Sequence, residues 1–324
     1  MEGNRRRLLG SMGLVLVAPA LAQGPKVRRI GFLGVPTAAS YTARIEALRA
    51  GLRDYDYVEG KNIVIEWRWA DGRLERLPQL AAELVRLNVE VIVTHTTPST
   101  MAAKKATSTI PIVITAVGDP VSTGLVQSLA RPGGNVTGLT FLQAELTTKR
   151  LELIRQTYPR AKRVGLLTNP ANPSHAVYFQ SLAEPARALK IDLQQFGARA
   201  KEELDGVLAS MLAGKVDAAV IAEDPVTIGN ARQIAEKARE LRLPIIGFRE
   251  IAEFGGLMAY GVDLNQSWRR SAFFVDRILK GAKPAELPIE RASRFEMLVN
   301  LKTAKALGVR IPQSVLQGAD RVIE

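Results

Sequence analysis

The chain has 324 residues, of which 47% are hydrophobic and 23% charged, and it carries a formal net charge of +12 and no cysteine. This length exceeds one compact unit and fits two modest lobes, and the composition excludes a disordered or membrane-embedded chain. The lack of cysteine excludes disulfides, thiolate metal sites, cysteine nucleophiles and the lipid-attachment cysteine of a lipoprotein.

The basic residues do not form a separate tract. They are interspersed with acidic residues, as in Arg44/Glu46 and Glu75/Arg76, and mixed charge of this kind is typical of solvated helix faces. We therefore predict that the positive net charge serves no nucleic-acid partner.

The first 22 residues predict an export signal. A positive start at Arg5–Arg7 precedes the uncharged, apolar or small run Leu8–Ala20, and Ala20-Leu21-Ala22 forms a small-x-small cleavage pattern. We expect residues 1–22 to be removed on export, which places a protein without a lipid anchor in the periplasm. The twin arginines also resemble a Tat signal, so the Sec and Tat routes both stay open. No later stretch reaches the roughly 20 apolar residues of a transmembrane helix.

From residue 27 onward, short apolar strands alternate with longer segments of helical period. The first series has predicted strands at 27–34, 62–69, 89–94, 112–115 and 136–140, and helices at 38–55, 74–88, 98–107 and from about residue 120. The second has helices at 146–158, 173–189, 201–213 and 225–242, and strands at 163–168, 192–196, 217–222 and 244–247. This repeated alternation predicts an α/β protein with two doubly wound parallel-sheet lobes.

The last third of the chain has a less regular pattern. It predicts a strand at 257–262, a helix at 265–280, a strand at 295–300 and a short helix at 301–307 closed by Gly308. The tail from Ile311 onward is expected to be irregular. Periodicity alone does not assign this tail to either lobe.

Four apolar strands run into a polar residue followed by proline: Thr97-Pro98, Asp119-Pro120, Asn172-Pro173 and Asp224-Pro225. Threonine, aspartate and asparagine cap helices well, and proline is favoured at the first helical position. Each pair therefore marks a helix start just beyond the carboxyl end of a strand, the edge at which open parallel sheets bind ligands. Four such edges in two similar lobes predict a cleft between facing edges.

Motifs that would carry catalysis are missing from the sequence. His95 and His175 are the only histidines and lack metal-ligand spacing, and no GxSxG, phosphate-loop or dinucleotide fingerprint is present. We predict no catalytic residue, metal or cofactor. The alternative is an exported α/β enzyme acting on a small polar substrate, for which the adjacent carboxylates Glu223 and Asp224 are the candidates, although adjacency alone does not make an acid–base pair.

Two stretches carry a specific resemblance. Residues 110–126 contain Ala-Val-Gly-Asp-Pro-Val before Gly124-Leu125-Val126, and residues 128–138 read Ser-Leu-Ala-Arg-Pro-Gly-Gly-Asn-Val-Thr-Gly. Both resemble the ABC transporter substrate-binding proteins related to tryptophan- and tyrosine-type binding proteins. The start of the first strand and the block at 52–63 are similar too, so the resemblance runs from about residue 27 to the C-terminus.

The resemblance implies a type I periplasmic-binding fold in which three chain crossings form a hinge. Lobe 1 would comprise residues 27–140 and 263–281, and lobe 2 residues 141–260 and 290–324. The crossings would lie near 140–143, 259–263 and 282–290. It also implies a monomeric binding protein that closes on a small ligand and docks transiently on an ABC permease at the inner membrane.

By the same reasoning the ligand lies between the lobes, at loops that follow strands. The expected ligand-binding residues are Thr37, Ser40, Tyr41, His95, Thr96, Thr97, Ser99, Gly118, Asp119, Thr168, Asn169, Asn172, Glu223, Asp224, Phe248, Arg249, Tyr260 and Asp263. Helix starts after Ala38 and Thr97 suit a carboxylate, aromatic residues including Phe141 suit a flat group, and the acidic residues suit an ammonium. This inventory predicts an amino acid or a small carboxylate, aromatic ones included, as the ligand.

Overall fold

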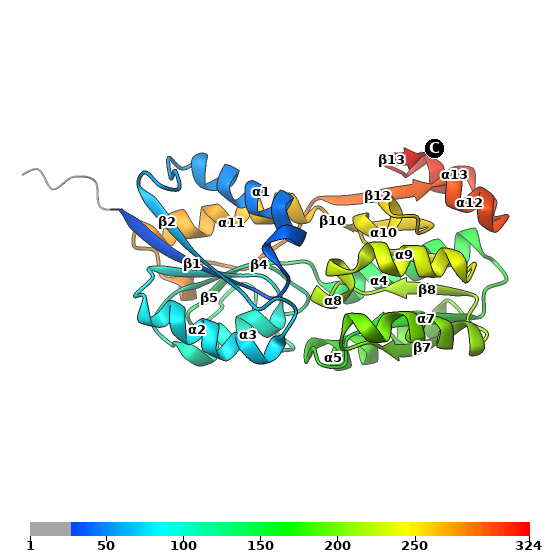
Figure 1. Cartoon of the computed structure of the whole chain (residues 1–324), viewed down its shortest axis with the longest axis horizontal. Helices are drawn as coiled ribbons and strands as arrows, with labels where there is room; N and C mark the ends of the chain where they lie inside the picture. Colours follow the sequence, from blue (N-terminus) through cyan, green and yellow to red (C-terminus); the bar gives the residue numbers. More distant parts are fainter. Residues whose placement is uncertain (1–26) are drawn as a thin grey trace, which may run out of the picture.

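The computed structural model describes residues 27–324, so the predicted signal peptide at residues 1–22 lies outside the described part. The described chain forms two lobes, each built on one sheet with helices on both faces (Figure 1). None of the helices in this part of the chain is long and apolar enough to cross a membrane.

Lobe 1 contains a six-stranded parallel sheet in the order β11-β5-β4-β3-β1-β2. Its strands are β1 (Arg28–Gly34), β2 (Ile63–Trp69), β3 (Val91–Thr94), β4 (Ile112–Val117), β5 (Val136–Thr140) and β11 (Glu290–Arg291). Its helices are η1 (Ala38–Tyr41), α1 (Thr42–Arg53), η2 (Leu74–Arg76), α2 (Leu77–Arg86), α3 (Thr97–Ala106), α11 (Leu264–Leu279) and η4 (Pro284–Glu286).

Lobe 2 contains a seven-stranded sheet in the order β13-β12-β10-β9-β8-β6-β7, in which β12 runs antiparallel to β10. Its strands are β6 (Arg163–Thr168), β7 (Asp192–Gly197), β8 (Ala218–Ile221), β9 (Ile245–Gly247), β10 (Met258–Val262), β12 (Phe295–Asn300) and β13 (Arg321–Ile323). Its helices are α4 (Gln143–Thr157), α5 (Ser174–Ser181), α6 (Ala183–Ala188), η3 (Lys201–Glu203), α7 (Leu204–Ala213), α8 (Pro225–Gly229), α9 (Ala231–Glu240), α10 (Arg249–Glu253), α12 (Leu301–Leu307) and α13 (Gln313–Gln317).

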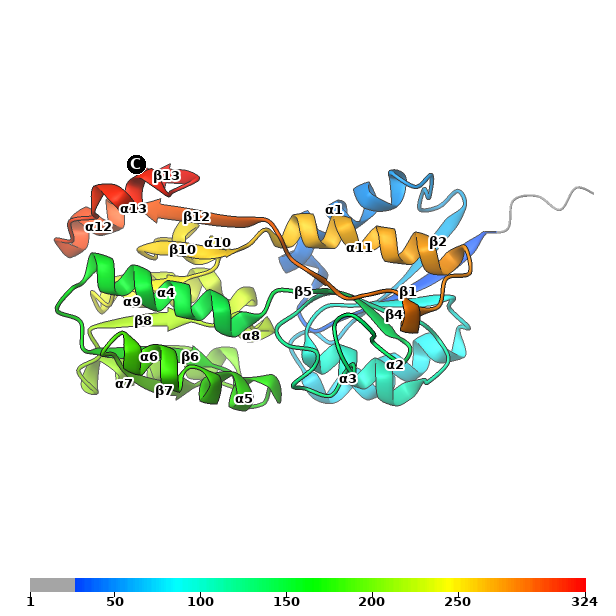
Figure 2. The ribbon, with the colours of Figure 1, turned by 180° about the vertical axis from the view of Figure 1, so that it is seen from behind.

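Alternate residues of each strand enter different apolar layers. In β1, Ile30 and Phe32 pack with α1 and α11 on one face, whereas Leu33 packs with α2 and α3 on the other. This alternation follows from the two-residue period of a strand, and both faces are covered because the sheet is parallel. The same arrangement in lobe 2 places α7, α9 and α10 opposite α4, α5 and α6 (Figures 1 and 2). The predicted α/β fold with two doubly wound sheets is confirmed.

The chain passes between the lobes three times. The first passage joins β5 to α4, the second joins β10 to α11, and the third joins β11 to β12 (Figure 2). The passages are hydrogen bonded to one another, since the Ala292 amide donates to the Thr140 carbonyl (2.7 Å) and the Asp263 amide donates to the Arg294 carbonyl (3.0 Å).

The third passage is displaced from its expected place. It was predicted at residues 282–290, with residue 290 opening the last part of lobe 2, but Glu290 and Arg291 pair with Leu139 and Thr140 in the sheet of lobe 1. The passage therefore follows at residues 292–294. A two-residue edge strand carries too little hydrophobic pattern to be found from sequence.

Other differences concern helices. No helix begins near Pro120. The carboxylate of Asp119 accepts from the amides of Val121 and Ser122 (3.1 and 3.0 Å), as a helix cap would, but the turn ends at Gly124, where φ is +69°. The helix predicted at 173–189 is divided into α5 and α6, because Pro185 has no N–H to donate to the preceding turn.

The segment predicted at 225–242 is likewise divided, at Gly229 and Asn230, into α8 and α9. Helix α10 was not predicted at all. The C-terminal tail is not irregular as expected: it forms α13 and then β13, which pairs with β12 and so belongs to lobe 2. Ile311 and Val315 of this tail are buried in the lobe 2 core.

Candidate ligand-binding site

The carboxyl ends of the two sheets face each other, and a pocket that is partly open to solvent lies between them. In each sheet the strand order reverses at one point. In lobe 1, β2 lies on one side of β1 and β3 on the other; in lobe 2, β7 lies on one side of β6 and β8 on the other. Loops diverge at such a point, so ligands of α/β proteins bind there. We call this space the inner pocket; its walls are His95, Thr96, Thr97, Ala116, Val117, Gly118, Phe141, Gln143, Asn172, Ser174, Glu223, Asp224, Pro225, Ile228 and Leu264.

His95 forms part of the lobe 1 wall, directly after β3. Its ring lies 3.2 Å by Nε2 from the Tyr41 hydroxyl and 3.2 Å by Nδ1 from the Thr115 hydroxyl, and the indole of Trp268 packs against it. Burial, together with the nearby charge of Arg44, lowers the pKa of His95 to about 3. The imidazole is therefore neutral at neutral pH, held in place, and a weak base.

The start of α3 presents hydrogen-bond donors to the inner pocket. Thr96 adopts φ +89° and ψ 154°, and this strained turn is held by the Ser99 hydroxyl, which donates to the His95 carbonyl, and by the Thr100 hydroxyl, which donates to the Thr96 carbonyl (2.8 Å). Thr97 lines the pocket, is 3% exposed, and its hydroxyl has no hydrogen-bond partner among residues 27–324. The helix N-terminus and this hydroxyl together suit an anionic group.

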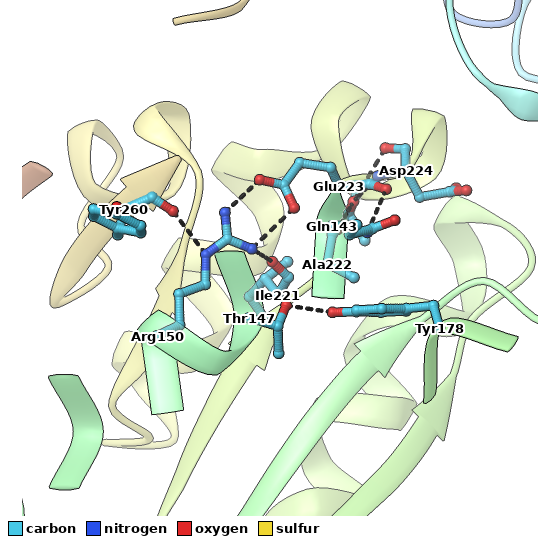
Figure 3. A network of polar contacts seen from close by, with 10 residues as sticks. Gln143, Thr147, Arg150, Tyr178, Ile221, Ala222, Glu223, Asp224 and Tyr260 are labelled. Atoms are coloured by element: carbon cyan, nitrogen blue, oxygen red, sulfur yellow. Dashed lines mark hydrogen bonds and ion pairs between the residues drawn. The ribbon is translucent and has the colours of Figure 1, made fainter. Parts of the chain in front are cut away.

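A buried ion pair supports the lobe 2 wall (Figure 3). The guanidinium of Arg150 in α4 donates from Nη1 to Glu223 Oε2 (2.9 Å) and from Nη2 to Glu223 Oε1, and its Nε donates to the Tyr260 carbonyl (2.8 Å). Burial opposes the charge of Arg150, but the attraction and hydrogen bonds of Glu223 outweigh it and raise the pKa of the guanidinium. The pair is electrically neutral as a unit.

Asp224 stands beside this pair as the cap of α8. Its Oδ1 accepts from Asn169 Nδ2 and from the Val226 amide (both 2.9 Å), and its Oδ2 accepts from Asn172 Nδ2 (2.9 Å). All three of these donors are neutral amides. A carboxylate oxygen accepts two hydrogen bonds, so Oδ2 has room for one more donor.

An ion pair joins the two lobes next to the inner pocket. Arg44 of α1 donates from Nη2 to Glu250 Oε1 of α10 (2.5 Å), and the Arg44 guanidinium carbon lies 4.5 Å from the centre of the Tyr41 ring. Tyr41 in turn contacts His95, which lines the pocket. The ion pair is thus two contacts away from any bound ligand.

The structure brings seven of the predicted site residues into the wall of the inner pocket: His95, Thr96, Thr97, Gly118, Asn172, Glu223 and Asp224. Tyr41, Ser99 and Asn169 lie behind them and hold them by the hydrogen bonds described above. Asp119 lines a neighbouring pocket.

The remaining predicted residues do not line the inner pocket, for identifiable reasons. Thr37 and Ser40 bond to each other at the exposed start of η1, and Arg249 pairs with Glu296. Phe248 is core, Asp263 caps α11, Tyr260 stacks on Phe295, and the Thr168 hydroxyl bonds to Gln195.

Sequence reasoning missed Gln143 and Arg150. Arg150 shares a four-residue spacing with Leu146 and Ile154, which are buried. A charged residue on the apolar stripe of a helix indicates a buried ion pair, and that signal was present in the sequence. Gln143 had no such signal, because its position depends on where the first passage between the lobes ends.

Comparison with known proteins agrees with this geometry. The family model described as ABC transporter substrate binding protein matches residues 35–323. A tyrosine-binding protein of Clostridioides difficile (strain R20291) is 30% identical over 261 residues, which cover 80% of this chain and 74% of the relative.

Two solved structures describe related proteins in different states. A protein of Streptococcus pneumoniae in complex with L-Trp is 26% identical, covers 91% of this chain and 99% of its own, and superposes with a TM-score of 0.85. A ligand-free, open substrate-binding protein of Clostridium difficile, also 26% identical, covers 92% and 99% with a TM-score of 0.67. Solute-binding proteins of lower identity share the fold, and the predicted type I periplasmic-binding architecture is confirmed.

Proposed function

The chain belongs to the family of ABC transporter substrate-binding proteins, and on this premise we propose that it binds a free amino acid with an aromatic side chain in the inner pocket. The carrying observation is the polarity of that pocket. Lobe 1 contributes the α3 N-terminus and the unpartnered Thr97 hydroxyl, and lobe 2 contributes the negative charge of Asp224. The hydrogen-bond donors of lobe 1 suit the carboxylate of a zwitterion, and the Asp224 carboxylate of lobe 2 suits its ammonium.

Apolar walls between these two ends suit the side chain of the ligand. Phe141, Val117, Ile228 and Leu264 contribute this apolar surface. The names of the relatives point to the same class, since one is a tyrosine-binding protein and another was solved with L-Trp.

Ligand binding would stabilise the closed arrangement of the lobes. At equal identity, this chain superposes better on the L-Trp complex than on the open, ligand-free structure, which supports a closed conformation here. A ligand that contacts both lobes favours the closed state by its differential affinity for the two states. We propose that the closed form docks on the ABC permease and that the protein acts as a monomer without nucleic acid.

We propose further that the ligand leaves unchanged. The imidazole of His95 is a weak base, and Glu223 is held by Arg150, so neither group is poised for general acid–base chemistry. Recovery of unaltered ligand after long incubation is expected, and a chemically altered product would contradict the proposal. The predicted export and cleavage after residue 22 are tested by sequencing the N-terminus of protein isolated from the periplasm.

The test of the binding proposal is calorimetry with L-tyrosine, L-tryptophan, tyramine and 3-(4-hydroxyphenyl)propionate. We expect the two amino acids to bind and the compounds without the carboxylate or the amine to bind at least about tenfold more weakly, since unpaired buried polar groups are costly.

Asp224→Asn should weaken binding by about 10- to 100-fold, the value of one charge-assisted hydrogen bond. Asp263→Asn is the matched control, because Asp263 also caps a helix but does not line the pocket. Equal binding of all four compounds, or equal effects of the two substitutions, would refute the assignment.

A further inference from the structure

Gln143 forms part of the wall of the inner pocket and also faces a second space. This second space, partly open to solvent, lies on the other side of the residue, and we call it the outer pocket. Gly118, Gln143 and Ser174 line both spaces. The outer pocket also contacts Asp119, Leu142, Glu145 and Tyr178, so it lies between the end of β4 and the starts of α4 and α5.

Gln143 is held firmly between the two spaces. It is 4% exposed, its amide N–H donates to the Gly118 carbonyl (3.2 Å), and its Nε2 donates to the Glu223 carbonyl (3.2 Å; Figure 3). A Cβ atom on Gly118 would lie 2.9 Å from Gln143 Oε1, so a larger residue at position 118 would displace the end of the Gln143 side chain. The partition is therefore made by contacts from both lobes.

The outer pocket has the chemistry to receive a cationic group. The carboxylate of Asp119 accepts the amides of Val121 and Ser122 on Oδ1 alone, which leaves Oδ2 without a hydrogen bond among the described residues. On the inner side, Gln143 bonds to the residue that precedes Asp224, the carboxylate we assign to the ligand ammonium. With its ammonium at Asp224, a ligand would place its amino end against the wall of the inner pocket that contains Gln143.

We propose that Gln143 determines the length of the ligand at its amino end. The proposal rests on the proposed function: with Gln143 in place the site accepts a free amino acid, and without it the inner and outer pockets form one site that accepts an amino acid extended at its amino group by one residue. In such a dipeptide the new ammonium lies against Asp119. A residue that excludes by filling space is a common source of specificity.

The test measures binding of L-tyrosine, L-tryptophan, glycyl-L-tyrosine and L-tyrosylglycine to the wild type, Gln143→Ala and Gln143→Met. The wild type should bind a free amino acid and neither dipeptide. Gln143→Ala should gain at least about tenfold in affinity for glycyl-L-tyrosine, the range that one small group in a pocket decides, and gain nothing for L-tyrosylglycine. Gln143→Met fills the space without the amide, so it should keep the selectivity of the wild type.

The outcomes separate the two proposals. If the wild type binds no aromatic amino acid, the proposed function fails and the length selection fails with it. If the wild type binds L-tyrosine or L-tryptophan but also binds glycyl-L-tyrosine equally, or if Gln143→Ala binds the dipeptide no better, only the role of Gln143 is overturned. Thermal unfolding checks that each variant is folded. If Gln143→Ala does not fold, Gln143→Ser is tested in its place.

Discussion

Replacing Arg150 by methionine tests the buried ion pair that supports the lobe 2 wall. Arg150 is fully buried, and Glu223 is 7% exposed, so the substitution leaves a carboxylate in the interior without its cation. The methionine fills most of the same space, so the cavity term is small. Breaking one member of a buried pair costs about 3–5 kcal/mol. The hydrogen bond from Arg150 Nε to the Tyr260 carbonyl, which ties α4 to β10, is also lost.

The expected loss depends on pH in a defined direction. A buried carboxylate without a cation is costly while it is charged, and protonation at low pH removes that cost. The difference between wild type and variant should be largest near pH 7 and smaller near pH 4.

The measurement is urea unfolding of the wild type, Arg150→Met and the double variant Arg150→Met/Glu223→Gln at both pH values. The double variant removes both charges, so it should recover most of the stability, as replaced buried pairs do in other proteins. A loss below about 1 kcal/mol in the single variant, or a double variant as unstable as the single one, would refute the view that the charge of Glu223 depends on Arg150.

Three further predictions concern closure, pH and the backbone. Arg44→Ala or Glu250→Gln removes the ion pair between the lobes, so ligand affinity should fall by about tenfold and small-angle scattering of the free protein should report a more open form; unchanged scattering and affinity would contradict this. Burial lowers the pKa of His95 to about 3 and also lowers the pKa of His175. Below about pH 6.5 the unfolded state therefore binds more protons than the folded state, so the free energy of unfolding should decrease as the pH is lowered, by up to about 1.4 kcal/mol per pH unit for each histidine. His95→Asn should make this dependence shallower, and an unchanged dependence would refute the assignment. Gly138→Ala should destabilise lobe 1 by more than about 2 kcal/mol in thermal unfolding, because φ is +129° and the new Cβ would lie 2.1 Å from a carbonyl oxygen of β4; a variant as stable as the wild type would show that the strand can shift.

Part of the site was predictable because four polar residues that each precede a proline follow strands, although the Thr97 hydroxyl does not cap α3 as expected. Thr97, Asn172 and Asp224 each precede a proline, and local rules alone place them at the carboxyl edge of a sheet. The structure places these three in one pocket. Asp119 also precedes a proline but caps a turn instead of a helix, because Gly124 at the end of that turn takes a left-handed conformation.

Two other predicted residues do not line the inner pocket, because their partners lie far away along the chain. Arg249 and Tyr260 were expected in the cleft because they follow or end strands near the hinge, yet one pairs with Glu296 and the other stacks on Phe295. Both partners belong to β12, which joins the sheet more than 30 residues later in the chain. A pattern local to one segment contains no information about a partner supplied by another.

Local sequence patterns were enough to predict the alternation of strands and helices, and composition alone excludes thiol chemistry because the chain has no cysteine. Only the tertiary structure decided that β11 returns to lobe 1, that Arg150 lies against Glu223, and that Gln143 separates the inner pocket from the outer one. Those features depend on contacts between residues about 73 to 151 positions apart, which form only when each lobe has folded.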